Sequence, residues 1–123
     1  MYYRRADACL LCYEIGTPME QLKERVQYWM NELSNNVHSD SCFVVLVGTK
    51  SDLGRNNDLR EEELIKLYPT RILTHITTSA KTGEGVAELF DYVGCQLIAL
   101  RAPVTEIQVT TCQPTQETKS SCC

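Results

Sequence analysis

The sequence lacks the features of several protein classes. No apolar run approaches the ~20 residues of a membrane-spanning helix, and no charged segment followed by an apolar stretch indicates a signal peptide. Basic residues are not in excess: the net charge is −4 and the isoelectric point is near 5.1. No Gly-x-x-x-x-Gly-Lys phosphate loop occurs in the 123 residues. We therefore expect a cytoplasmic protein that does not bind nucleic acid.

Cysteine is abundant, but its pattern does not favour a disulfide scaffold or a metal site. There are seven cysteines, an odd number, and Cys9, Cys12 and Cys42 lie in apolar runs where reduced, buried thiols are expected. Cys9 and Cys12 have the spacing of a zinc knuckle, but on a strand their side chains would point to opposite faces. The histidines, His38 and His75, are isolated from any cysteine cluster. We predict no metal site, so a cysteine-rich metal or redox protein is the weakest interpretation.

Three apolar segments have the composition of strands. Residues 8–13 and 42–47 are continuous apolar runs, which is typical of strands covered on both faces in a parallel sheet. Residues 72–78 are rich in β-branched residues and form a weaker third candidate.

A helix is predicted between the first two strands. Thr17 has the position of an N-cap, Pro18 lies in the first turn and Glu20 follows three residues after the cap. An apolar stripe with spacings of three and four follows, and we expect it to pack in the core: Leu22, Val26, Trp29, Met30 and Leu33.

Two more helices are predicted further along the chain. One follows Asp58 and ends at Pro69, with Leu64 and Leu67 on its inner face. The other covers about residues 84–100, ends before Pro103 and has a predicted buried stripe of Val86, Leu89, Phe90, Val93 and Leu97. Alternating strands and helices predict an α/β domain over residues 1–101, with three helices and a three-stranded, mainly parallel sheet. Residues 102–123, rich in Thr, Gln, Ser and Pro, are predicted to form a disordered tail.

Two polar loops follow predicted strands, where ligand-contacting loops of parallel sheets lie. In the loop 48–52, Asp52 can accept two parallel hydrogen bonds, which suits the ring N–H and amino group of guanine and not adenine. The aliphatic stems of Lys50 and, from the loop 78–83, Lys81 can cover the two faces of a base. The backbone N–H of Ala80 can donate to the guanine carbonyl, and Ser79 can brace this turn.

The same loops carry a family resemblance. The chain resembles the Rab family of Ras-like small GTPases, whose Asn-Lys-x-Asp and Ser-Ala-Lys motifs correspond here to Thr49-Lys50-Ser51-Asp52 and Ser79-Ala80-Lys81. Tyr2-Tyr3-Arg4-Arg5-Ala6 is similar to a Tyr-Tyr-Arg-Gly-Ala stretch of that family, and Cys122-Cys123 matches its usual terminus. The resemblance implies that Thr49, Lys50, Asp52, Ser79, Ala80 and Lys81 bind the guanine of GTP or GDP. Thr49 in place of asparagine implies weaker base affinity or loop coupling, and Arg5 in place of glycine adds a bulky charge.

The resemblance also implies that this is part of a P-loop-type G domain. The family's phosphate loop, its switches and its Mg²⁺ ligands have no counterpart in the sequence. We expect that the chain alone does not hydrolyse GTP, that it binds nucleotide weakly or not at all, and that an apolar sheet edge makes it prone to association. An incomplete gene model or an internal start at Met1 would explain the shortening.

The terminal thiols and the partners are likewise implied by the resemblance. Cys122 and Cys123 would both be geranylgeranylated, because two lipid chains give the stable membrane anchoring that one chain does not. The chain would then act in vesicle trafficking on the cytosolic face of endomembranes, with Rab escort, dissociation-inhibitor and effector proteins as partners. Two unmodified thiols, and a non-catalytic interaction protein instead of a switch, stay open as alternatives.

Overall fold

Three parallel strands form one sheet in the order β1-β2-β3, with helices between and after them. The computed structural model describes residues 4–37, 41–54 and 61–101. Along the chain lie β1 (Ala8–Glu14), α1 (Met19–Asn36), β2 (Phe43–Thr49), the 3₁₀ turn η1 (Ser51–Leu53), α2 (Glu61–Leu67), β3 (Ile72–Thr77) and α3 (Val86–Arg101). The predicted α/β fold with a parallel three-stranded sheet and three helices is confirmed. The predicted tail lies outside the described residues.

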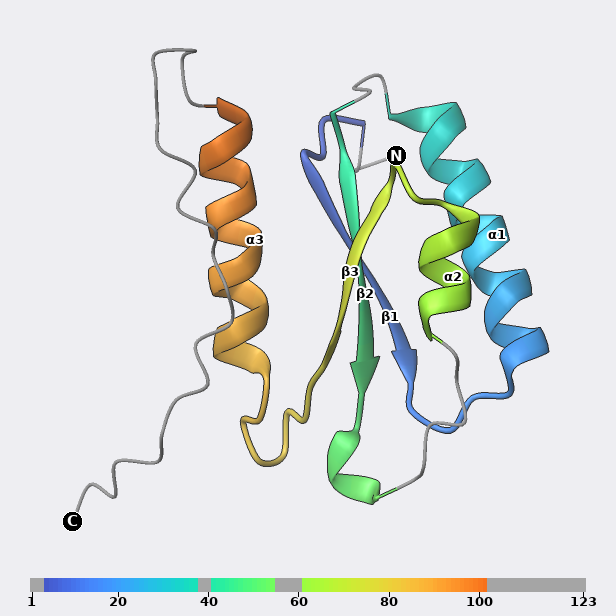
Figure 1. Cartoon of the computed structure of the whole chain (residues 1–123), viewed down its shortest axis with the longest axis vertical. Helices are drawn as coiled ribbons and strands as arrows, with labels where there is room; N and C mark the ends of the chain where they lie inside the picture. Colours follow the sequence, from blue (N-terminus) through green and yellow to red (C-terminus); the bar gives the residue numbers. More distant parts are fainter. Residues whose placement is uncertain (1–3, 38–40, 55–60, 102–123) are drawn as a thin grey trace.

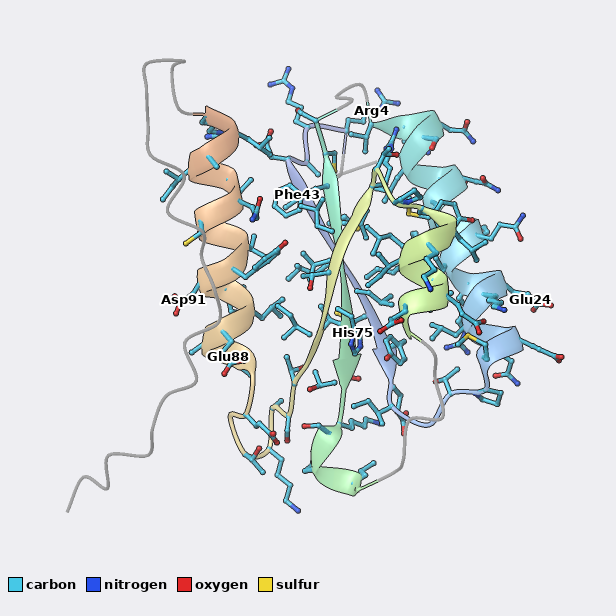
Figure 2. All side chains as sticks on the ribbon, in the orientation of Figure 1. Arg4, Glu24, Phe43, His75, Glu88 and Asp91 are labelled. Carbon is cyan, nitrogen blue, oxygen red and sulfur yellow. The ribbon has the colours of Figure 1, made fainter. Side chains whose placement is uncertain are left out.

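The helices cover both faces of the sheet. Figure 1 shows α1 and α2 on one face and α3 on the other. Val44 and Leu46 of β2 pack toward α1 and α2, whereas Phe43, Val45 and Val47 pack with Leu89 of α3. In Figure 2, Glu24 and Asp91 lie on the outer sides of α1 and α3, and Phe43 lies between sheet and helix. The central strand is therefore buried on both faces, which explains its continuous apolar sequence.

Strand β1 is less enclosed than its sequence predicts. Among the described residues its backbone pairs with β2 alone, and its side chains are half-buried apart from the buried Tyr13 and the exposed Cys12. Its first half lines an open apolar groove of about 270 Å³ together with the preceding segment and α1. The lining residues are Ala6 before the strand, Ala8, Cys9 and Leu10 of β1, and Trp29 and Leu33 of α1. The expectation of a strand covered on both faces is thus met only in part.

Helix α1 buries four residues at the predicted spacing, Leu22, Val26, Met30 and Leu33. The prediction that Trp29 packs in the core is wrong: it is 43% exposed and stands edge-on to Tyr28, with ring centroids 5.3 Å apart. Trp29 lies 100° around the helix from Met30, which places its large ring at the margin of the buried stripe.

The start of α1 also differs from the prediction. The helix begins at Met19, with Pro18 as its N-cap residue and no side-chain cap. The Thr17 hydroxyl instead donates to the Glu14 carbonyl, at 2.7 Å. Thr17 therefore closes the turn that leaves β1, and its predicted role as N-cap is wrong.

Two apolar residues predicted to be buried in α2 and α3 are exposed. Leu64 is fully buried, but Leu67 is 58% exposed, because the short α2 contacts the core through Leu64 and then Ile65. In α3, Phe90 is 61% exposed, while Tyr92 is among the residues packed against β2. No helix among the residues that the structure describes is long and apolar enough to cross a membrane.

Helix α2 offers a matched pair for testing this core. We expect Leu64→Ala to lower the free energy of unfolding by about 2–5 kcal/mol, because it removes a fully buried side chain and leaves a cavity. Leu67→Ala on the same helix removes an exposed side chain and should cost less than about 1 kcal/mol. Urea denaturation followed by circular dichroism measures both values. Equal losses would contradict this assignment of the buried face.

The thiols of the sheet should react at different rates. Burial, together with the neighbouring Cys42 and Cys12, raises the pKa of Cys9 to about 11. Burial also raises the pKa of Cys42, and partial desolvation by its neighbours raises the pKa of Cys12, although Cys12 is exposed. Since the thiolate is the nucleophile, iodoacetamide at pH 8 should label Cys12 before Cys9 and Cys42. Mass mapping of peptides against time checks the order. If all three thiols of the folded chain were labelled at the same rate, the predicted order would be wrong.

Candidate functional site

The strand register brings two polar loops to one edge of the sheet. Tyr13 pairs with Gly48 and Gly48 pairs with Thr77, so all three strands end at the same level. The loop after β2, the loop after β3 and the turn after β1 therefore emerge side by side. This confirms the placement expected for loops at the carboxyl ends of parallel strands.

Three side chains from the ends of β1 and β3 pack over Gly48. A Cβ atom there would lie 3.1–3.2 Å from Ile15 Cγ1, His75 Nε2 and the Tyr13 hydroxyl. The Tyr13 hydroxyl and His75 Nε2 are themselves hydrogen-bonded, at 2.8 Å. Figure 2 places His75 near the ends of the strands. A larger residue at Gly48 would have to displace these three side chains, each by a few tenths of an ångström.

The first loop turns sharply at Lys50. Its φ of 60° puts it in the left-handed region, the one non-glycine residue there among those described. The backbone on either side is held by hydrogen bonds from Ile15 N–H to the Thr49 carbonyl, at 3.0 Å, and from Ser51 N–H to the Thr78 carbonyl, at 3.1 Å. The turn leads directly into η1, which carries Asp52.

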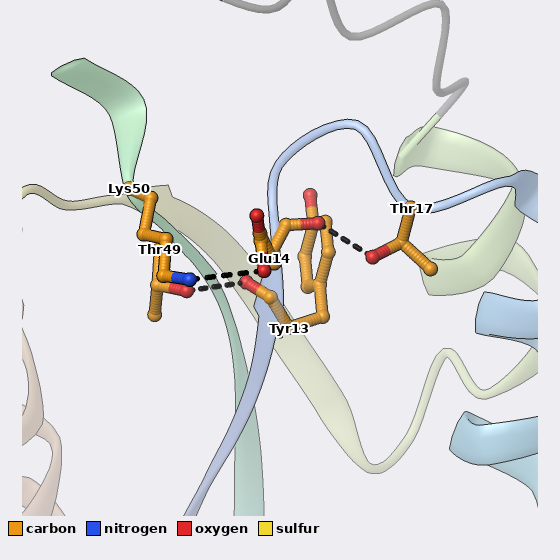
Figure 3. A network of polar contacts seen from close by, with 5 residues as sticks. All are labelled: Tyr13, Glu14, Thr17, Thr49 and Lys50. Atoms are coloured by element: carbon orange, nitrogen blue, oxygen red, sulfur yellow. Dashed lines mark hydrogen bonds and ion pairs between the residues drawn. The ribbon is translucent and has the colours of Figure 1, made fainter. Parts of the chain in front are cut away.

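The first loop is also tied to β1 by two side chains, shown in Figure 3. The Thr49 hydroxyl donates to the Tyr13 carbonyl at 2.9 Å, and the Lys50 ammonium pairs with the Glu14 carboxylate at 3.1 Å. Sequence reasoning did not identify Glu14 as a partner of Lys50. The place of Glu14 directly after the predicted strand 8–13 is a signal that could have put it at this edge of the sheet, whereas its pairing with Lys50 depends on the strand register.

The second loop is organised by Ser79, which is fully buried. Its N–H donates to the Glu84 carbonyl at 2.9 Å, and its carbonyl accepts from Gly83 N–H at 2.8 Å. Gly85 then leads into α3 with a φ of 72°, and a Cβ there would lie 2.0 Å from the Thr77 carbonyl oxygen. The exposed Ala80 and Lys81 lie on the turn that these bonds close.

A hydrogen bond between Ser79 and Asp52 joins the two loops. The Ser79 hydroxyl donates to Asp52 Oδ1 at 2.6 Å and accepts from Thr82 N–H at 3.2 Å. This bond is the largest cause that lowers the pKa of Asp52. Desolvation opposes it and is the next largest effect, and a backbone hydrogen bond and the charges of Lys81 and Lys50 lower the pKa further. Asp52 therefore stays ionised and exposed, and each carboxylate oxygen can accept more than one hydrogen bond.

The structure thus brings together the two groups of predicted base-binding residues. Thr49, Lys50 and Asp52 lie on one loop, and Ser79, Ala80 and Lys81 on the other, with the Asp52–Ser79 bond between them. Cys122 and Cys123 lie outside the described residues. Within residues 4–37, 41–54 and 61–101, no three histidine, cysteine or acidic residues are grouped so as to hold a metal ion.

Comparisons with known proteins match most of the chain. The sequence model of the Ras family matches residues 1–99. The chain is 37% identical to the Ras-related protein Rab-24 of Dictyostelium discoideum over 75% of its length and 45% of the relative's. It is 33% identical to human Ras-related protein Rab-17 over 80% of its length and 45% of the relative's. A third relative is the GTP-binding protein YPT52 of Saccharomyces cerevisiae, 32% identical over 82% of this chain and 51% of that protein.

The chain spans about half the length of the curated relatives that it matches. The loops after β2 and β3 stand at the edge of a parallel sheet in the order that the resemblance to Rab proteins requires. With the family match over residues 1–99, this shows that the chain belongs to the Ras family of small GTPases.

Proposed function

We propose that the loops after β2 and β3 hold the guanine base of GTP or GDP. The observation that carries this proposal is the 2.6 Å bond from Ser79 to Asp52, which joins the two loops and fixes the position of an exposed carboxylate. A site of this kind needs an ionised acceptor that is fixed in place before the ligand arrives. Asp52 meets that requirement.

Asp52 also accounts for the choice of base. Guanine presents a ring N–H and an amino group side by side, and both can donate to one carboxylate. Adenine presents an acceptor nitrogen at the corresponding position, which would face the negative charge of Asp52. The stems of Lys50 and Lys81 then cover the faces of the base, and Ala80 N–H donates to its carbonyl oxygen.

Thr49 has a different task in this proposal. Its hydroxyl donates to the Tyr13 carbonyl, so it fixes the loop to β1. Thr49 therefore contributes to base binding by positioning Lys50 and Asp52, in addition to any contact that it makes with the nucleotide.

The wider role that we propose is that of a Rab-type switch in vesicle trafficking. Relatedness to Rab-24 and Rab-17 supports it. In this proposal geranylgeranyl groups on Cys122 and Cys123 anchor the protein to the cytosolic face of endomembranes, and escort, dissociation-inhibitor and effector proteins are its partners. Residues 102–123 act as the tether between the domain and the lipids.

A nucleotide titration of the 123-residue chain tests base binding. The contacts proposed for the base amount to about 4 kcal/mol, which corresponds to roughly millimolar affinity. We expect GDP and GMP to shift the NMR signals of Asp52, Ala80 and Lys81 at millimolar concentration, and ADP to leave them unchanged. Equal shifts with ADP would refute the proposed specificity. Micromolar affinity for GDP would contradict the proposal, because it would show that the chain makes more contacts with the nucleotide than those proposed here.

Asp52→Asn should change which base is preferred. The asparagine amide offers one acceptor and one donor, so its NH₂ group would oppose a guanine N–H and weaken GDP binding by at least about tenfold. Xanthine carries a carbonyl in place of the amino group, and its diphosphate should bind this variant better than GDP does. The matched control is Asp91→Asn on the outer side of α3, which should bind GDP like the unchanged chain. Retained guanine preference in Asp52→Asn would contradict the assignment.

A further inference from the structure

The ion pair between Lys50 and Glu14 joins the first base loop to the end of β1. Nζ and Oε2 lie 3.1 Å apart, and the two side chains are 58% and 40% exposed. Figure 3 shows the Lys50 side chain extending from the end of β2 toward Glu14. Because an exposed ion pair contributes little to global stability, its consequence must be sought locally, in what it does to the Lys50 side chain.

The partner that Lys50 meets is itself held in place. The Glu14 carbonyl accepts hydrogen bonds from the Thr17 hydroxyl, at 2.7 Å, and from Thr17 N–H, at 3.1 Å. Glu14 also pairs with Thr49 in the register of β1 and β2. The backbone that carries the Glu14 carboxylate is therefore held both by the turn to Thr17 and by the pairing of β1 with β2.

The backbone of Lys50 is fixed, whereas its side chain depends on Glu14. Hydrogen bonds at Thr49 and Ser51 hold the left-handed turn on both sides. A lysine side chain has four rotatable bonds, and ordering it on binding a ligand has an entropic cost. An ammonium that is already paired lowers this cost, because the stem is ordered before a base arrives.

A second carboxylate, that of Asp52, lies within electrostatic range of the same ammonium. The charges of Lys81 and Lys50 both act on Asp52, on the turn that follows Lys50 directly. A Lys50 released from Glu14 would be free to approach Asp52 and occupy the acceptors that guanine needs. Pairing with Glu14 directs the ammonium toward β1 instead.

We propose that Glu14 is a positioning residue for guanine recognition: it holds the Lys50 ammonium at the end of β1, so that the stem is ordered as one wall of the base site and Asp52 is left to the base. This inference rests on the proposed function of the two loops. Thr17 supports it by fixing the backbone of Glu14.

Glu14→Gln tests this role, with a matched ion pair as control. Lys23 and Glu63 form a similarly exposed pair at 3.4 Å on α1 and α2, away from the loops. In GDP titrations of the full chain followed by NMR, Glu14→Gln should weaken binding about three- to tenfold, from the ordering of one long side chain, and Glu63→Gln should not. In a Lys50→Met background Glu14→Gln should have no further effect. A loss of the same size in that background would assign Glu14 a merely structural role and overturn the proposal.

A second measurement needs no nucleotide. The Leu53 N–H donates to the Lys50 carbonyl at 3.2 Å, so its hydrogen exchange reports on the turn that Lys50 begins. Because other hydrogen bonds hold the backbone of this turn, Glu14→Gln should leave this exchange unchanged, as should Glu63→Gln. Exchange that is at least about threefold faster in Glu14→Gln would show that Glu14 holds the backbone and not the Lys50 side chain, and would overturn the proposal, as would tighter GDP binding by that variant. A chain that shows no preference for guanine over adenine refutes the proposed function instead, while the exchange rates still decide the role of Glu14.

Discussion

The packing of three side chains over Gly48, where the strands end, is the constraint on which the rest of this site depends. A Cβ atom there would meet Ile15 Cγ1, His75 Nε2 and the Tyr13 hydroxyl at 3.1–3.2 Å, so these side chains cover the strand end this closely because the residue has none. Beside them the Gly48 carbonyl accepts a hydrogen bond from Thr78 N–H at 2.7 Å, immediately before the second loop. Both loops therefore start from fixed points a few ångströms apart, and short polar side chains are long enough to connect them.

From these fixed points two kinds of contact build the site. Ser79 crosses from the second loop to Asp52 on the first, and Glu14 crosses from β1 to Lys50. The first contact fixes the position of the Asp52 carboxylate and lowers its pKa, and the second holds the Lys50 ammonium at the end of β1. Ser79 thus acts at short range on Asp52, whereas Glu14, in the proposed role, limits the freedom of the flexible Lys50 side chain.

The sequence predicts the fold well because β2 is apolar on both faces and the helices have clear apolar stripes. It predicts the place of the loops because parallel strands put their carboxyl ends at one edge. It fails for Trp29, Leu67 and Phe90, which lie at the margins of helical stripes, where docking angle and side-chain size decide exposure. It also misses Glu14, because the contact with Lys50 joins residues 36 positions apart and depends on register, which no local pattern encodes.

The threonine at position 49 shows how register changes the meaning of a substitution. Judged by motif alone, Thr49 in place of asparagine removes an amide that would reach toward the nucleotide. In the sheet, Thr49 pairs with Glu14 and its hydroxyl reaches the Tyr13 carbonyl one residue earlier, while its own carbonyl accepts from Ile15 N–H. Tyr13, Glu14 and Ile15 therefore hold the start of the first loop: all three contact Thr49, and Glu14 also pairs with Lys50. A short hydroxyl suits this position because it bonds to a neighbouring strand, and the longer amide would have to turn away from it to reach a ligand.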